Sequence, residues 1–324
     1  MSIRVKLYDN EYEKRWKDLL ARAHNATIFH DLKFLSYHPD SKFKTSHLLF
    51  FRNDRLISAM PAAILERSGK DVLASPYGAS WGGLLLPGNL GVEDVHEIVE
   101  AMIRFAVKSS IGGIEITLPP IVYLQRQDQV QEYCLLASGF RMSKGEVTEI
   151  IYLPGFSESA LKSSYRRAVG KANRCGVRVK PSQQFGPFHE ILCADRAEKK
   201  VLPTHSLADL ERIHLLLPDR IRLFTAVIDG EIVGGTLLFV AARKTVLNMY
   251  LCQLAEGRSA RVANILMYES ACWARDAGFT YYDLGTSSIE MVPNWGLTRF
   301  KEGFLARGYV RPTYVLHIAE ASNG

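Results

Sequence analysis

The sequence predicts an α/β protein of the α+β type, built from two domains of similar topology in which a mixed, mainly antiparallel sheet is flanked by helices. Three observations support this prediction. The chain has 324 residues, of which 47% are hydrophobic and 23% charged, and this composition and length suit a two-domain globular protein. Its strands occur as hairpins followed by a helix and a further strand, unlike the strict alternation of a doubly wound sheet. The same order of elements occurs twice.

The first copy begins with a hairpin in residues 46–65 that turns at Asn53-Asp54, and the second with a hairpin in residues 222–240 that turns at Asp229-Gly230. A helix and a strand follow in each copy, with apolar spacing that predicts helices over residues 95–106 and 265–272 and strands over 114–118 and 279–284.

Each copy is then expected to have a helix that ends in a Gly–aromatic pair, Gly139-Phe140 or Gly308-Tyr309, and a closing strand over 148–153 or 314–318. This duplication predicts an N-terminal domain over residues 1–152 and a C-terminal domain over residues 153–324.

Several classes of protein are disfavoured. The sequence contains no G-x-G-x-x-G after a strand, no G-x-x-x-x-G-K-[ST] and no G-x-S-x-G, which argues against common nucleotide-binding and serine-hydrolase folds. Five cysteines and nine histidines lack the spacing of a zinc site, so we expect no metal. No apolar run is long enough to span a membrane and the N-terminus lacks a signal core, so we expect a cytoplasmic protein.

The excess positive charge is concentrated in residues 161–180, LKSSYRRAVGKANRCGVRVK. The chain carries 40 Lys and Arg against 34 Asp and Glu, and seven basic residues but no acid lie in this segment, which leaves 33 basic and 34 acidic residues elsewhere. Apolar residues at helical spacing predict a helix with one buried and one cationic side. The cationic side is either a solvated face or a site for phosphate, nucleotide or RNA. The candidate ligands are Arg166, Arg167, Lys171 and Arg174.

Residues 281–308, YYDLGTSSIEMVPNWGLTRFKEGFLARG, hold most of the candidate catalytic residues. Asp283 and Ser287 lie where a predicted strand ends, which is a common ligand site in α/β sheets but is equally consistent with a simple turn. In the following helix Leu297, Phe300 and Phe304 are expected to form a buried stripe. Lys301 lies on the flank of that stripe, where it either extends to solvent or points at a phosphate or oxyanion. Trp295 in the same stretch is a further candidate for substrate binding.

A second candidate binding segment lies in the first copy, in SPYGASWGG over residues 75–83. Glycines next to two aromatic side chains and two hydroxyl groups suit either a binding loop or a structural turn. Tyr77, Ser80 and Trp81 are its candidate substrate-binding residues.

Three features make the chain resemble the Fem-type aminoacyltransferases and their relatives with a BioF2-like acetyltransferase domain. They are the basic helix from Tyr165-Arg166-Arg167 to Gly176-Val177, the strand end Asp283-Leu284-Gly285, and the segment GLTRFKEGF over 296–304, which is similar to the family's G-L-x-x-F-K-x-x-F-G. The chain departs from that motif at Leu305 and lacks the helical arm of some Fem enzymes. The resemblance covers nearly the whole chain and implies two tandem GNAT-like domains of the short, armless type.

The resemblance implies transfer of an acyl or aminoacyl group to an amine, with Lys301 serving the donor or the charge of the transition state. The first domain is then a degenerate, substrate-binding copy and the second the catalytic one, with the reaction between them. Tyr250, Asp283 and Glu290 are the candidates for proton transfer. No bound cofactor is expected; the co-substrate is aminoacyl-tRNA or acyl-CoA.

GNAT enzymes that use acetyl-CoA usually present Q/R-x-x-G-x-G/A between strand and helix, and the matching segment here is LAEGRSA over 254–260. Only Gly257 fits the pattern, although Arg258 and Arg261 can compensate with positive charge. This departure favours aminoacyl-tRNA slightly as the donor.

Two alternatives remain at this point. One is a CoA-dependent or carrier-protein-dependent N-acyltransferase acting on an amino sugar in polysaccharide biosynthesis, and the other is a non-catalytic module that binds RNA or phosphate. The sequence leaves the acyl group, the acceptor amine, the pathway and the oligomeric state open.

Overall fold

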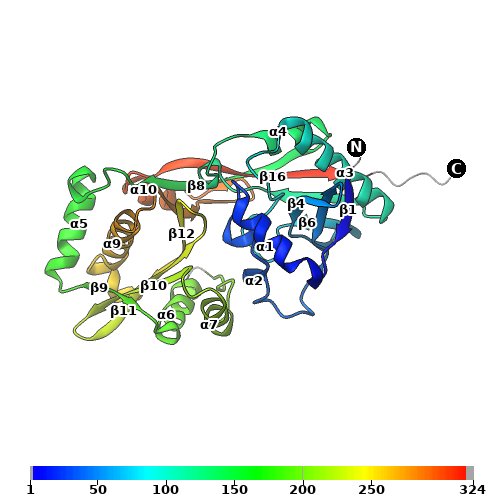
Figure 1. Cartoon of the computed structure of the whole chain (residues 1–324). Helices are drawn as coiled ribbons and strands as arrows, with labels where there is room; N and C mark the ends of the chain where they lie inside the picture. The colour runs from blue at the N-terminus through cyan, green and yellow to red at the C-terminus, as the bar shows by residue number, and fades with distance from the viewer. Residues whose placement is uncertain (1–2, 199, 319–324) are drawn as a thin grey trace. The chain divides into compact units, whose positions relative to one another are not determined.

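The computed structural model describes residues 3–198 and 200–318 (Figure 1). The described chain forms two compact units: residues up to Glu146 together with those from Val310 on make up the first, and Val147–Tyr309 the second. The chain crosses from the first unit to the second within strand β8 (Arg141–Tyr152) and returns within strand β16 (Arg307–His317).

The first unit has an antiparallel sheet in the order β1-β3-β4 and further strands in the order β2-β5-β6-β7-β16, among which only β6 and β7 pair in parallel. Asn53 and Asp54 have φ values of 48° and 58°, which is the conformation of a tight hairpin turn and confirms the turn predicted there. The bounds are β1 Arg4–Leu7, β2 Lys44–Thr45, β3 Leu48–Arg52, β4 Arg55–Met60, β5 Ala63–Arg67, β6 Lys70–Ser75 and β7 Gly113–Thr117.

The longest helix of the first unit is α3 (Val92–Lys108), whose apolar side, with Val95, Ile98 and Met102, is buried in the main core of the unit. A smaller core forms around Trp16 of α1 and strands β3 and β4. The other helices are η1 Asn10–Tyr12, α1 Glu13–Arg22, η2 Ile28–His30, α2 Leu32–Leu35, η3 Ile121–Tyr123 and α4 Val130–Ala137.

The second unit contains strands in the order β8-β13-β12-β11-β10-β9, in which β12 and β13 pair in parallel and the other neighbours are antiparallel. Each unit therefore has the mixed, mainly antiparallel sheet that the sequence predicted. The bounds are β9 Arg178–Ser182, β10 Ile221–Ile228, β11 Glu231–Val240, β12 Thr245–Gln253 and β13 Tyr281–Thr286, with a small hairpin of β14 Ser288–Ile289 and β15 Val292–Pro293.

Helices cover both faces of this sheet. A Cβ atom at Gly234 of β11 would meet Val262 of α9, and one at Gly235 would meet Phe188 of α6. Because successive residues of a strand face opposite sides, α9 and α6 lie on opposite faces. Helix α5 packs beside α9 (Figure 1). The helices of this unit are η4 Glu158–Ala160, α5 Ser163–Arg174, α6 Phe185–Ala197, α7 Leu207–Leu216, α8 Ala255–Ser259, α9 Val262–Asp276 and α10 Trp295–Glu302.

Two local predictions for the region after residue 295 were wrong. The helix α10 ends at Glu302, and Gly308 and Tyr309 lie in β16 rather than at a helix end. Leu297 was expected in the buried stripe, but it is 38% exposed, whereas Phe304 is fully buried. The helix is short, with eight residues, so its first turn extends beyond the core that Phe304 enters.

Strands β12 and β13 pair over only three residues each, Thr245–Leu247 and Tyr281–Asp283. Beyond this point β12 has a register shift opposite Leu237 and Leu238 of β11, and Gly285 turns β13 into the left-handed region with φ 75°. Within the described residues, the second half of β12 therefore has no strand partner on its β13 side.

Helix α10 is held against α5 by Tyr165. The tyrosine ring packs against Phe300 and Phe304, and its hydroxyl donates to the Arg299 carbonyl over 3.1 Å. The ring occupies the space where a side chain at Gly303 would lie, because a Cβ atom there would come within 1.8 Å of the ring.

Replacing Gly303 by Ala should therefore lower the free energy of unfolding by about 1–3 kcal/mol through overpacking. A matched control is Gly296→Ala, in the same helix, where the nearest heavy atom to a new Cβ is 3.5 Å away. That change should be neutral or stabilising by up to about 1 kcal/mol because Ala favours helix. Urea denaturation of both variants measures the difference, and equal midpoints would contradict the packing of Tyr165 on Gly303.

Candidate active site

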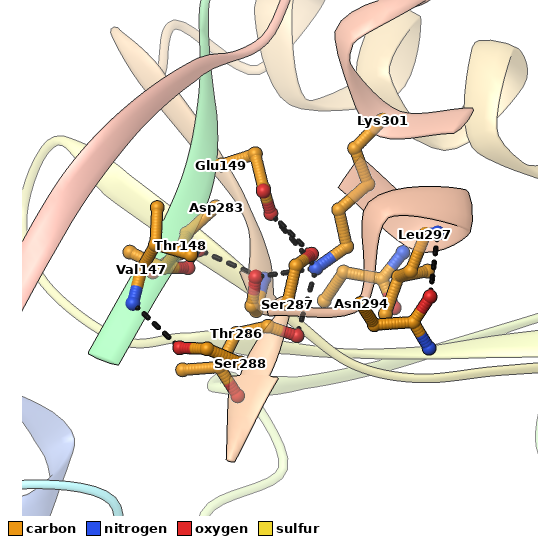
Figure 2. Close-up of polar contacts among 12 residues, drawn as sticks. Val147, Thr148, Glu149, Asp283, Thr286, Ser287, Ser288, Asn294, Leu297 and Lys301 are labelled. Carbon is orange, nitrogen blue, oxygen red and sulfur yellow. Dashed lines mark hydrogen bonds and ion pairs between the residues drawn. The ribbon is translucent and has the colours of Figure 1, made fainter. Parts of the chain in front are cut away.

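The end of strand β13 is bound by a network of buried polar side chains (Figure 2). The Gly285 amide donates to Asp283 Oδ1 over 2.8 Å, and Thr148 Oγ1 donates to the same oxygen over 2.5 Å. Ser287 Oγ donates to Glu149 Oε2 over 2.5 Å, and its amide donates to the Val147 carbonyl. The predicted strand end at Asp283–Ser287 is thus a rigid turn fixed to strand β8.

Lys301 completes this network from helix α10. Its Nζ lies 2.5 Å from the Gly285 carbonyl oxygen, 3.0 Å from that of Thr286 and 3.2 Å from Glu149 Oε2. An ammonium group has three N–H donors, so these three oxygens use all of them. The side chain is 4% exposed, and burial lowers the pKa of the Lys301 ammonium while the Glu149 carboxylate opposes this shift. Lys301 is therefore a buried side chain that holds the strand end in place through its hydrogen bonds, and it does not extend to solvent.

Gly285 is the residue that allows one ammonium to bind two successive carbonyls. Carbonyls of adjacent residues point in opposite directions in an extended strand. At Gly285 the backbone has φ 75°, which Gly adopts without steric cost and other residues rarely adopt. The strand end Asp283-Leu284-Gly285 and Lys301 are thus parts of one structure.

Glu149 is the member of this network that the sequence did not single out. It is 1% exposed, and its Oε1 atom has no hydrogen-bond partner among the described residues. The signal in the sequence is a carboxylate inside a strand, residues 148–153, that is otherwise almost free of charge. Such a buried carboxylate needs a cation nearby, and the topology supplies Lys301.

The structure separates the three candidates for proton transfer. Asp283 is 1% exposed and belongs to the Lys301 network. Tyr250 of β12 is also buried, its hydroxyl lies 2.7 Å from His205 Nδ1, and burial raises its pKa. Glu290 is exposed in the turn between β14 and β15. Their roles in proton transfer remain predictions.

A cavity of about 660 Å³ lies in the second unit between α5, α8, the start of α9 and α10. Arg167 and Lys171 of α5 line it together with Arg258 and Arg261, and no acidic residue does so. Arg258 forms an ion pair with Glu198. The side chains of Arg167, Lys171 and Arg261 have no hydrogen-bond or ion-pair partner in the described chain, so the cavity holds at least three uncompensated positive charges. The other lining residues are Ser164, Tyr165, Ala168, Gln253, Ala263, Asn264 and Phe300.

The cationic stripe predicted on α5 is divided by this geometry. Arg167 and Lys171, four residues apart, line the cavity, whereas Arg166 and Arg174 do not, and Arg166 donates instead to the Ser159 carbonyl. Gly257 is buried in α8 behind Val262 and does not line the cavity either, although its neighbour Arg258 does. Gln253 and Asn264 are lining residues that the sequence did not indicate.

The first unit has a cavity of different chemistry, with a volume of about 750 Å³. Its walls include the rings of Tyr8, Trp16, Phe43, His47 and Tyr77. Ionic residues of both signs also line it: Glu13, Lys17, Asp31, Lys33 and Asp40. Aromatic rings and ionic groups thus share the walls of this cavity, which we call the aromatic cavity, and its three acids outnumber its two cations.

The hydrogen bonds of His47 fix the direction of the Tyr77 hydroxyl in that cavity. His47 Nδ1 accepts from the Ala62 amide over 3.2 Å, so the neutral ring carries its proton on Nε2, 3.4 Å from the Tyr77 oxygen. Burial lowers the pKa of His47 to about 4, so the ring is neutral near pH 7. The Tyr77 oxygen therefore accepts from His47, and its own proton has no acceptor among the described residues.

The remaining candidate residues lie elsewhere. Trp81 is 1% exposed, donates its indole N–H to Thr27 and packs against Phe29 and Tyr123 in the core. Ser80 lies beside it without lining a described cavity. Trp295 is 63% exposed at the start of α10. Binding by these three residues remains a prediction.

Comparison with known proteins agrees with a fold of mixed, mainly antiparallel sheets flanked by helices. Residues 159–302 match the model of the GNAT acetyltransferase domain family. No curated protein matches the chain in sequence. The structural neighbours include a protein named FemX and a tandem GNAT protein, so the resemblance predicted from the motifs is confirmed at the level of the fold.

A crystal structure of FemX superposes with a TM-score of 0.73 at 13% identity, covering 97% of each chain. The structure of L-PGS from Bacillus licheniformis gives 0.64 at 12% identity over 94% of this chain and 91% of that one. A tandem GNAT protein from the clavulanic acid biosynthesis pathway gives 0.59 at 13% identity over 99% and 100%.

Lys301→Met should leave Glu149 as a buried carboxylate without its cation and lower the free energy of unfolding by about 3–5 kcal/mol. The double variant Lys301→Met, Glu149→Gln should recover part of this loss because the buried charge is gone. A matched control is Lys17→Met, which breaks the exposed pair between Lys17 and Glu13 and should leave the free energy of unfolding nearly unchanged, because water and salt screen an exposed pair. Urea denaturation at pH 7 measures all three, and equal losses for Lys301 and Lys17 would refute the buried network.

The lowered pKa of His47 predicts a loss of stability in acid. The unfolded chain takes up a proton on this ring below pH 6.5, whereas the folded chain does so only near pH 4. The unfolded state thus binds more protons between these values, and the free energy of unfolding should fall by about 3 kcal/mol from this group as the pH drops from 6.5 to 4.

In His47→Asn, whose Oδ1 can accept from Ala62, this contribution should be missing. Urea denaturation at about pH 7, 5.5 and 4, which bracket this window, measures how the free energy of unfolding of each protein changes with pH. Parallel slopes would show that His47 is not held neutral in the folded state.

Proposed function

We propose that this protein is an N-acyltransferase that moves an acyl or aminoacyl group from a phosphate-bearing donor to an amine. The observation that carries this proposal is the cationic cavity of the second unit, inside the segment that matches the GNAT domain. Arg167, Lys171 and Arg261 meet there from two helices with no acid among the lining residues. Such a cavity favours a polyanion, and both aminoacyl-tRNA and acyl-CoA carry one.

The N-terminus of helix α9 is a second reason to expect an anion in this cavity. The helix has fifteen residues, so its N-terminus presents partial positive charge, and Arg261, Ala263 and Asn264 at this end line the cavity. The Ala263 amide donates to Gln253 Oε1, so part of the backbone is already occupied. Most of the positive charge therefore comes from side chains.

This source of charge is the reason we favour aminoacyl-tRNA slightly as the donor. Residues 255–259 form helix α8, and the Gly257 amide bonds the Leu254 carbonyl, so this segment does not present a free row of amides to a pyrophosphate. Long cationic side chains suit the spaced phosphates of a nucleic acid. Among the structural neighbours, the tandem GNAT protein from the clavulanic acid pathway is described in a form without AcCoA. Acyl-CoA therefore stays the alternative donor, with an amino sugar as its acceptor.

Lys301 acts in this proposal by fixing the end of β13. Its three donors are used by protein oxygens, and it holds Gly285 and Thr286 in the turn that ends the pairing with β12. Its positive charge contributes to the field at that turn, where the second half of β12 lacks a strand partner. Acyl transfer depends strongly on such fixed positioning.

The aromatic cavity of the first unit is the proposed site of the acceptor. Aromatic rings line it together with the carboxylates of Glu13, Asp31 and Asp40, and this combination suits an acceptor that carries an amine. This assignment keeps the predicted division into a substrate-binding and a catalytic domain.

The test is product formation from a panel of aminoacyl-tRNAs and acyl-CoAs with a panel of amines, followed by mass analysis. Arg167→Gln with Lys171→Gln should raise the KM for the donor at least about tenfold, because two charge-assisted contacts are lost. The matched control is Arg166→Gln with Arg174→Gln, which removes the same charge from the same helix outside the cavity and should change KM less than about twofold.

RNase sensitivity of the activity would identify tRNA as the donor, and a shift of the thermal midpoint with CoA thioesters would identify CoA. Salt-dependent RNA binding that both double variants weaken equally, with no product from any donor, would refute the proposal and favour a non-catalytic binding module.

A further inference from the structure

A short segment of the second unit exposes several large apolar side chains together. We call it the apolar hairpin: β14, β15 and the first turn of α10. Its side chains Ile289, Met291, Val292, Trp295 and Leu297 are 79%, 57%, 70%, 63% and 38% exposed. Single exposed apolar residues are common, but five within nine positions concentrate exposed apolar area in one short segment, and such a concentration usually marks an interaction surface.

The fold fixes this segment and does not leave it loose. Ile289 pairs with Val292 across a two-residue turn, in which Glu290 and Met291 have φ values of 48° and 64°. At the base of the hairpin the Asn294 amide donates to the Ser287 carbonyl, and Asn294 Oδ1 accepts from the Leu297 amide. Ser287 belongs to the Lys301 network, so the buried core of the unit holds the apolar hairpin in place.

Helix α10 links the apolar hairpin to a positively charged part of the second unit. Helix α10 carries Trp295 and Leu297 in its first turn and Phe300, which lines the cationic cavity, in its second. Its neighbour α5 contributes Tyr165, which bonds the Arg299 carbonyl, and has basic residues but no acid between Ser163 and Arg174. Apolar and cationic groups are thus joined through one short helix.

We propose that the second unit docks on the surface of an anionic lipid bilayer, with the apolar hairpin in the interfacial region and the cations of α5 toward the headgroups. Aliphatic side chains with a Trp, next to Lys and Arg, are the combination that binds peripheral proteins to such surfaces. The core of a protein interface is instead depleted in charged residues, whereas residues 162–174 hold five cations and no acid. This proposal does not depend on the proposed function.

None of the helices in the described chain is long and apolar enough to cross a membrane. The proposed contact is therefore peripheral and reversible. Glu290 at the tip of the hairpin opposes it, because a carboxylate is repelled by anionic headgroups. Removal of that charge should strengthen binding.

The full-length protein should co-sediment with vesicles of phosphatidylcholine and phosphatidylglycerol but only weakly with phosphatidylcholine alone. Ile289→Ser with Val292→Ser should lower the partition coefficient at least about tenfold, since several buried CH₂ groups are lost. The matched control is Leu215→Ser, an equally exposed apolar residue (80%) in α7, which should bind as the parent does. Glu290→Gln should bind more tightly.

Trp295 provides a second measurement. All four tryptophans lie in the described chain, and only Trp295 is largely exposed, so a blue shift of the emission on adding vesicles reports its transfer from water. The shift should be absent in Trp295→Phe.

Three outcomes would overturn the proposal. One is no binding to the anionic vesicles, and another is equal loss of binding in the hairpin and Leu215 variants. The third is RNA binding or self-association of the protein that responds to these variants while vesicles are not bound, which would assign the surface to nucleic acid or to a second copy of the chain.

Discussion

The ion pair between Lys301 and Glu149 is the interaction on which the arrangement of the second unit depends. Moving both charges out of water carries a large desolvation cost, which a bare pair seldom recovers. Here two backbone carbonyls and the Ser287 hydroxyl add hydrogen bonds to the same two groups. The pair is therefore better understood as a device for fixing a backbone shape: without it, the carbonyls of Gly285 and Thr286 would lose their buried donor and the end of β13 would lose its anchor.

Several features follow from this anchored strand end. The turn at Gly285 ends the parallel pairing with β12, and β12 continues to Gln253, which lines the cationic cavity. Ser287 links the same turn to the apolar hairpin through the Asn294 amide. One buried network thus positions an exposed apolar segment and the start of α10. The second turn of the same helix borders the cationic cavity through Phe300. Lys301, in the segment GLTRFKEGF, therefore links these features through its contacts with Gly285, Thr286 and Glu149.

The sequence was sufficient for the elements with strong local signals. The hairpins at Asn53-Asp54 and Asp229-Gly230, helix α3 and the basic helix α5 follow from turn chemistry and apolar spacing, which act over a few residues. Glu149 was missed because its partner lies 152 positions away, and only the pairing of β8 with β13 brings them together. The exposure of Leu297 was missed for a related reason: helical spacing predicts which residues share a side of α10, but not how far that short helix reaches over the core.

The division of the basic stripe on α5 shows how tertiary structure refines a charge pattern. Four cations at helical spacing are equivalent in the sequence, yet packing of α5 beside α9 directs Arg167 and Lys171 into a cavity and leaves Arg166 and Arg174 outside it. Arg261 has only Arg258 as a basic neighbour in the sequence. It joins Arg167 and Lys171 in the cavity because it lies at the start of α9. The cationic residues of the cavity lie about ninety positions apart in the sequence. Their mutual repulsion destabilises the folded state, because no acidic residue lines the cavity to offset it. A bound polyanion would relieve this repulsion, which is the physical reason to regard the cavity as a binding site rather than a solvated face.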